Sequence, residues 1–172
     1  MAEQGDSTRT LGRIMWLLAW LLALVLMTWY FQQKLEQDRN PNRQVQLLDN
    51  ATLVLEQNRQ GHYLAGGAIN GQAVVFLLDT GATQVAVPRA LAERLGLAPG
   101  RRLALNTAAG QAEGYATRIK TLSLGPLSLY DLDAVIMPSD STEVLLGMNA
   151  LRQFELIQRG SRLTIRHLDP AP

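Results

Sequence analysis

The chain has 172 residues, a formal net charge of +1 and an apolar fraction of 47%. This length accommodates one domain with an appendage, and the near-neutral charge gives no reason to expect nucleic acid as a partner. The sequence holds no cysteine, which excludes disulfides, thiolate metal sites and a cysteine nucleophile.

The first predicted element is a transmembrane helix over residues 14–31, preceded by a polar segment, residues 1–13, that we expect to be disordered. Residues 14–31 contain no charged side chain and reach the lower length limit for crossing a bilayer. Trp16, Trp29 and Tyr30 lie towards its two ends, where amphipathic rings favour the headgroup region. A cleaved signal peptide is the alternative, although the bulky residues MTWYFQQK replace the small-residue cleavage pattern. A buried core helix fits less well, because the segment has no polar face.

Basic residues flank this span on both sides, namely Arg9 and Arg13 before it and Lys34, Arg39 and Arg43 after it. The positive-inside rule therefore leaves the orientation of the span open. The next segment, residues 32–48, is charged and contains Asn40-Pro41-Asn42, which is a linker composition. It can begin as a helical extension of the span and end at the proline.

From residue 49 to residue 168 short apolar runs alternate with turn residues, which predicts a mainly β domain with one or two short helices. Asn70-Gly71 between two apolar runs predicts a hairpin with a type I′ turn, which needs positive φ at both positions. A short helix is predicted from Pro88 to Gly96. Further turns are expected at Ala109-Gly110, Gly125-Pro126 and Arg159-Gly160. The closely spaced strands favour a closed or sandwich-like β fold.

The stretch VVFLLDTGATQVAVP, residues 74–88, places a carboxylate within an otherwise apolar run. Burying an ionised carboxylate is unfavourable unless it is paired or hydrogen-bonded, so Asp79 has either a turn-forming or a catalytic role. The turn-forming role is ordinary chemistry, in which the carboxylate accepts from backbone N–H groups and Gly81 supplies positive φ. The apolar runs on both sides indicate instead a turn held inside the core.

Two later segments accompany this motif. The apolar pair Leu145-Leu146 meets Gly147 and is followed by the helix-like MNALRQF. Between the two lies NTAAGQAEGYA, a polar hairpin of small residues whose tip comprises Thr107, Ala108, Ala109 and Gly110.

These segments, in this order over roughly residues 50–166, resemble the retropepsin-like aspartic proteases of the single-domain, membrane-anchored bacterial type. The resemblance implies a retropepsin-like closed β-barrel, the acid-protease fold, preceded by the transmembrane helix. It also implies the following roles: Asp79 as the catalytic residue, Thr80, Gly81, Ala82 and Thr83 as the active-site loop, Thr107, Ala108, Ala109 and Gly110 as the substrate-binding flap, and Leu145, Leu146 and Gly147 as the structural segment that crosses the aspartate strand. Within the loop, Thr80 would brace through its hydroxyl and the Gly81 N–H would hold the carboxylates. Retroviral enzymes have Gly-Arg-Asn or Gly-Arg-Asp where this chain has Gly147-Met148-Asn149, so the contacts of the retroviral arginine do not carry over.

The chain holds one such aspartate motif, since Asp131 and Asp133 lack the turn glycine. A complete pair of catalytic carboxylates therefore requires a homodimer, with Asp79 from each chain meeting at a two-fold axis. The resemblance implies an aspartyl endopeptidase that hydrolyses peptide bonds in peptide or protein substrates with a water activated by this pair, without a cofactor or a metal. It further implies a single-pass protein of the bacterial inner membrane with its catalytic domain in the periplasm.

Two other interpretations remain open. The same fold could bind peptides and dimerise without cleaving, although such a module has no need of an intact Asp-Thr-Gly-Ala motif. A structural β domain on a membrane anchor would leave the flap-like hairpin unexplained.

Overall fold

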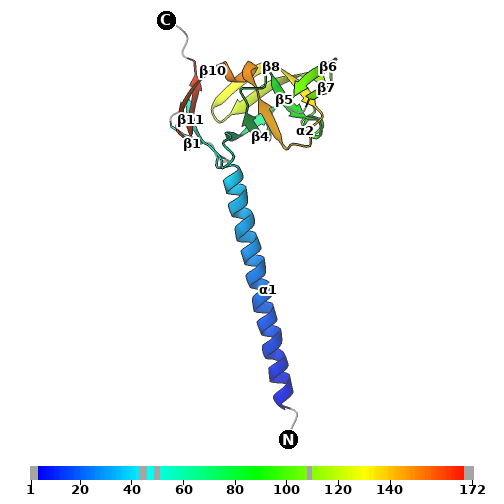
Figure 1. Ribbon diagram of the computed structural model, residues 1–172, viewed down its shortest axis with the longest axis vertical. Helices are drawn as coiled ribbons and strands as arrows, with labels where there is room; N and C mark the ends of the chain where they lie inside the picture. The colour runs from blue at the N-terminus through cyan, green and yellow to red at the C-terminus, as the bar shows by residue number, and fades with distance from the viewer. Residues whose placement is uncertain (1–3, 43–45, 49–50, 108–109, 169–172) are drawn as a thin grey trace. The chain divides into compact units, whose positions relative to one another are not determined.

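The computed structural model describes residues 4–42, 46–48, 51–107 and 110–168, and the chain divides into two units between Arg39 and Asn40 (Figure 1). The first unit is one helix, α1 (Gln4–Arg39). Among the described residues, its Leu11–Arg39 portion is the one helix long and apolar enough to cross a membrane, a property that signal sequences near an N-terminus share.

Helix α1 is longer than the predicted span of residues 14–31. Residues 4–13, predicted to be disordered, and residues 32–39, predicted as part of a linker, are both helical. Neither segment contains a proline, and extending an existing helix is far easier than nucleating one, so the helix propagates in both directions from the apolar span. It ends at Arg39, just before Asn40-Pro41, because a proline disfavours helical backbone at the residue that precedes it.

The β domain begins at Asn40, earlier than the predicted residue 49, because Asn42 is built into it. Asn42 is 3% exposed, and its Nδ2 donates to the backbone oxygens of Glu56 and Leu64, both at 2.8 Å. Its Oδ1 accepts from the Glu56 N–H at 2.7 Å. Glu56 ends strand β2 (Thr52–Glu56) and Leu64 begins β3 (Leu64–Ile69), so one buried amide joins the start of the domain to two strands. The predicted linker therefore extends too far.

A closed barrel forms the centre of the domain. The larger sheet has the strand order β3-β4-β9-β5-β8-β7-β6, and a further pairing of β3 with β7 closes it into a ring that leaves β6 outside. The strands not yet located are β4 (Gln72–Leu78), β5 (Val85–Pro88), β6 (Arg102–Thr107), β7 (Gly110–Leu124), β8 (Leu127–Met137) and β9 (Glu143–Leu146). The prediction of a closed β-barrel is confirmed.

The predicted hairpin turn and short helices of the barrel are also confirmed, whereas the turn expected at Ala109-Gly110 includes a residue outside the described ones. Asn70 and Gly71 have φ angles of 50° and 80°, as the predicted turn between β3 and β4 requires. The two short helices are α2 (Arg89–Arg94) and α3 (Met148–Leu151). Helix α2 starts directly after Pro88, and the chain leaves it at Gly96, which has a φ angle of +65°.

A second sheet closes one side of the core. It has the order β1-β2-β11-β10 and contains β1 (Gln46–Leu47), β10 (Phe154–Arg159) and β11 (Arg162–His167). Leu53 and Leu55 of β2 and Ile165 of β11 are fully buried and belong to the same apolar cluster as the barrel. The two sheets therefore share one core.

On the outer surface of the second sheet, a side-chain hydrogen bond from Arg166 holds the pKa of Glu155 below its ordinary value.

The buried amide of Asn42 predicts a measurable contribution to stability. We expect Asn42→Ala to lower the free energy of unfolding by about 2–3 kcal/mol, because it leaves the buried backbone groups of Glu56 and Leu64 without their partners. The measurement is denaturant unfolding of the full chain, followed by circular dichroism. As a control, the exposed Asn106→Ala should stay within about 0.5 kcal/mol of the unaltered chain. Equal stability of the two variants would contradict a domain that begins at Asn40.

Candidate active site

Asp79 follows directly on β4, and residues 79–84, the aspartate loop, connect β4 to β5. The alternating burial of Val74, Val75 and Phe76 shows β4 standing in the barrel wall. The alternation ends at Leu78, where the strand leaves the barrel and the loop begins. The local sequence therefore changes from apolar to polar at the place where the barrel wall ends.

The aspartate loop lies at the surface of the single chain. Asp79 and Ala82 are partly exposed, and Thr80, Gly81 and Thr83 are exposed. The expectation of a turn held inside the core is wrong for one chain on its own. The flanking strands are apolar because they line the core, whereas the residues of the loop between them are partly or fully exposed.

Backbone groups of the loop hold the Asp79 carboxylate. The Gly81 N–H donates to Asp79 Oδ1 at 2.8 Å, and the Ala82 N–H donates to the Asp79 backbone oxygen at 3.3 Å. The first bond has the form of an Asx turn. A carboxylate forms such a bond whether its role is structural or catalytic, so the bond alone does not distinguish the two roles. It leaves Asp79 Oδ2 free of hydrogen bonds to any described residue.

The hydroxyls of the two loop threonines do not form the hydrogen bond expected of Thr80. Thr80 and Thr83 are exposed, and neither hydroxyl makes a hydrogen bond within the part of the chain that the structure describes. The bracing role expected for the Thr80 hydroxyl is therefore not seen within one chain. The backbone oxygen of Thr83 does accept a bond, from the Asn149 N–H at 3.1 Å.

Strand β9 passes between the two ends of the loop. It runs parallel to β4, with Leu145 opposite Leu77, and meets β5 through the pair Ala86 and Leu145. The Asp79 N–H donates to the Leu146 backbone oxygen at 3.2 Å. The apolar-apolar-glycine segment thus runs alongside the aspartate strand as its parallel neighbour and, contrary to the expectation, does not cross it.

Gly147 is required by how closely two backbones approach each other. A Cβ atom at this position would lie 2.4 Å from the Gln84 backbone oxygen and 2.8 Å from that of Ala82. Both are backbone atoms, so no change of side-chain rotamer could relieve the contact. Directly after Gly147, the Met148 N–H donates to the Ala82 backbone oxygen at 2.8 Å.

Asn149 is a residue of this site to which the sequence assigned no role. Its Oδ1 accepts from the Val85 N–H at 2.9 Å, and its Nδ2 donates to the Asp133 backbone oxygen at 2.6 Å. The signal in the sequence was an amide side chain directly after Gly147-Met148, but Val85 is 64 residues away in the chain. A pairing over that distance cannot be read from local pattern.

The hairpin expected to be the flap is formed by β6 and the first part of β7. Thr107 pairs with Gly110, and the Thr107 hydroxyl donates to the Gly110 backbone oxygen at 2.7 Å. Ala108 and Ala109 lie outside the described residues. Strand β6 pairs with β7 alone and alternates between exposed and partly buried residues, so the hairpin extends from the barrel wall.

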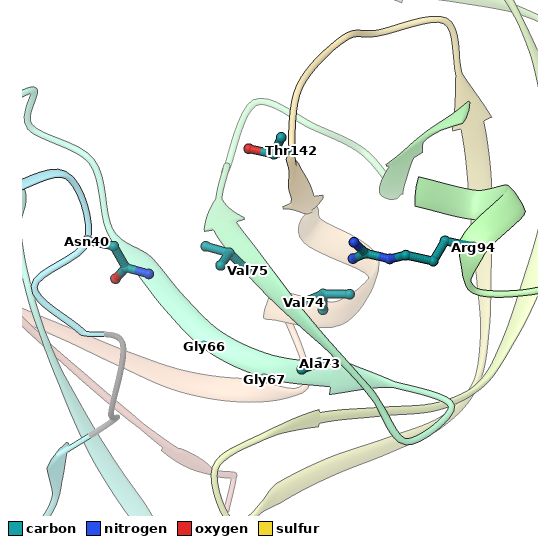
Figure 2. A pocket seen from close by; sticks show the side chains of 8 residues that line it. All are labelled: Asn40, Gly66, Gly67, Ala73, Val74, Val75, Arg94 and Thr142. Atoms are coloured by element: carbon teal, nitrogen blue, oxygen red, sulfur yellow. The ribbon is translucent and has the colours of Figure 1, made fainter. Parts of the chain in front are cut away.

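Within the described ranges, no three histidine or acidic side chains come together as metal ligands would. The groups that the loop itself offers are the Asp79 carboxylate, the hydroxyls of Thr80 and Thr83, and backbone amides. A separate hollow of about 360 Å³ lies over β3 and β4, lined by Asn40, Gly66, Gly67, Ala73, Val74, Val75, Arg94 and Thr142 (Figure 2). Asp79 is not part of it.

The sequence model of a family described as gag-polyprotein putative aspartyl protease matches residues 65–153. The matched range includes the aspartate loop, the β6–β7 hairpin and the segment from Leu145 to Asn149. It therefore contains every part of the site that the geometry brings together.

Three relatives give the wider comparison. An "Uncharacterized protein in cobV 5'region" from Sinorhizobium sp is 29% identical over 119 residues, which are 66% of this chain, and the chain spans about half (51%) of that relative's length. The crystal structure of a retropepsin-like aspartic protease from Rickettsia conorii has 24% identity and a TM-score of 0.58, covering 67% of this chain and 90% of that one. EIAV protease complexed with the inhibitor HBY-793 has 22% identity and a TM-score of 0.45, covering 55% of this chain and 89% of that one. The fold is retropepsin-like.

Proposed function

This chain belongs to the family of gag-polyprotein putative aspartyl proteases, and we propose that it is an aspartic-type endopeptidase whose catalytic group is the Asp79 carboxylate. One observation carries the proposal above the others. Asp79 lies partly exposed on a loop that backbone hydrogen bonds hold on both sides, since its own N–H donates to Leu146 and the Met148 N–H donates to Ala82. A carboxylate that served only the turn would not need a neighbouring strand to fix its position.

The reaction needs two carboxyl groups, and each chain supplies one. Two facing carboxyl groups cannot both ionise easily, so they share one proton. The ionised member takes a proton from a water molecule, whose oxygen adds to the carbonyl carbon of the peptide bond. The protonated member stabilises the developing oxyanion, and a proton passes to the nitrogen as the C–N bond breaks. The second carboxyl group is Asp79 of a second copy of the chain.

The exposed surface of the loop supports such a dimer. Thr80, Gly81 and Thr83 are exposed and uncharged, so these residues cause no like-charge repulsion when two copies approach. The like charges that meet are the two Asp79 carboxylates, whose repulsion the shared proton relieves. Met148, 37% exposed and bonded through its N–H to Ala82, adds apolar surface beside the loop. Without the retroviral arginine at this position, we expect the association to be weak.

Helix α1 would compensate for weak association. A single-pass anchor confines the copies to a bilayer and raises their effective concentration, as tethering does in general. The family resemblance to membrane-anchored bacterial proteases supports an inner-membrane location with the catalytic domain in the periplasm. The β6–β7 hairpin would cover a peptide or protein substrate bound between the two aspartate loops.

The first prediction for this function concerns Asp79. We expect Asp79→Asn to lower the cleavage of a mixed peptide library by at least about a thousandfold, because each dimer loses both carboxylates. The assay uses the full chain in membranes from acidic to neutral pH. The control is Asp140→Asn, which removes the same charge from an exposed loop residue and should leave cleavage unchanged. If the unaltered chain binds peptides without cleaving any, the domain is a binding module instead.

The second prediction tests the shared pair of carboxylates by mixing subunits. When one part of the unaltered chain is equilibrated with nine parts of Asp79→Asn, at a concentration where nearly all chains are dimeric, random pairing leaves about a tenth of the active chains paired with an active partner. Activity per unaltered chain should therefore fall to about a tenth of its value without the variant. Activity that does not respond to the variant, at concentrations where sedimentation shows mixed dimers, would refute a site built from two chains.

The third prediction concerns the membrane. We expect the chain to remain in the membrane fraction at its full mass, with an alkaline phosphatase fused to its C-terminus active, because that enzyme needs the oxidising periplasm. A cytoplasmic reporter such as β-galactosidase should be inactive in the same position. Active β-galactosidase would reverse the orientation, and a shortened soluble product would show that α1 is a signal sequence.

A further inference from the structure

We propose that Asn149 is a positioning residue for the aspartate loop, whose side-chain amide fixes the end of the loop opposite Asp79. The inference rests on the proposed function for its effect on catalysis, but the positioning itself is a property of the fold. It follows from the bonds of the Asn149 side chain to β5 and β8, from the bond of its backbone to the loop, and from the burial of Val85.

The Asn149 amide uses both of its ends. Its Oδ1 accepts from Val85, the first residue of β5, and its Nδ2 donates to the backbone oxygen of Asp133 in β8. The backbone N–H of Asn149 donates to the Thr83 oxygen inside the loop. A primary amide is the neutral side chain that offers an acceptor and a donor from the same planar group. One residue of α3 thus connects the loop, β5 and β8.

The hydrogen bond from the Val85 N–H to the Asn149 side chain matters most for the position of the loop. Val85 is 0% exposed, so its N–H has no access to water. The Asn149 oxygen takes the place of a neighbouring strand at the point where the loop ends and β5 begins. A buried N–H group without an acceptor is strongly disfavoured, so removal of this oxygen would force Val85 and the loop to move.

The two ends of the loop are held by different means. At the Asp79 end, the backbone of β9 holds the loop through the bond from the Asp79 N–H to Leu146. That bond involves no side chain and survives substitution. At the other end, backbone bonds from Met148 and Asn149 hold Ala82 and Thr83, and the Asn149 side chain adds the bond to Val85. Substitution of that side chain can therefore displace the end of the loop without removing the carboxylate. A displacement of about 1 Å at a catalytic group can reduce turnover by about a hundredfold.

The test compares three variants of the full chain in detergent micelles. Asn149→Leu removes both amide bonds at similar volume, and we expect kcat to fall about 10- to 100-fold with KM within about twofold. Asn149→Asp keeps an acceptor for Val85 and should recover most of the lost kcat. Its activity relative to the unaltered chain should rise at acidic pH, where the introduced carboxyl group is protonated and can donate to Asp133. Gln153→Ala, which removes a bond to the Asn149 backbone oxygen alone, should leave kcat within about twofold.

Hydrogen exchange provides a readout that does not depend on activity. In Asn149→Leu, the Val85 amide should exchange at least about tenfold faster, while amides of β7 and β8 keep their protection. Unchanged Val85 exchange would overturn the proposal, whether or not the chain cleaves peptides. Loss of protection across all strands would also overturn it, because the amide would then stabilise the whole fold. Absence of Asp79-dependent cleavage with faster Val85 exchange would refute the proposed function and keep the positioning role.

Discussion

The close contact between Gly147 and the aspartate loop is the constraint on which the site depends. Two backbones meet there with no space for a side chain, since a Cβ at Gly147 would lie 2.4 Å from the Gln84 backbone oxygen. This closeness lets the next residue, Met148, bond directly to Ala82. The position of the loop is therefore set by a strand that comes much later in the chain. The six residues of the loop alone, rich in small and polar side chains, would not define one conformation.

Strand β9 and Met148 hold the backbone of the loop, while the side chains of the loop stay partly or fully exposed. This arrangement explains how a carboxylate can follow an apolar strand without being buried. In the single chain Asp79 is partly exposed and accepts the Gly81 N–H, so folding does not require an ionised group to be fully buried. In the proposed dimer, desolvation of the carboxylates accompanies association instead, and the shared proton reduces the charge to be buried. The electrostatic cost thus falls on dimer formation, which fits an association that needs help from a membrane anchor.

Features defined by local chemistry were predictable from the sequence. The turn at Asn70-Gly71 was predicted because it needs positive φ at both residues, and both have it. The segment ending at Gly147 was identified from its position after the aspartate motif, which the family resemblance implies. The extent of α1 was not predictable, since helix propagation beyond the apolar span leaves no mark in hydropathy. Nor were Asn42 and Asn149, because their amides bond to backbone groups that only the folded chain brings near.

These two asparagines have a physical role in common. Each bonds to backbone groups at a strand terminus, Asn42 at Glu56 and Asn149 at Val85, where the ladder of the sheet supplies no partner. An amide satisfies a donor and an acceptor together and carries no charge. A neutral amide can therefore satisfy these backbone groups without adding a buried charge, which would itself need a partner.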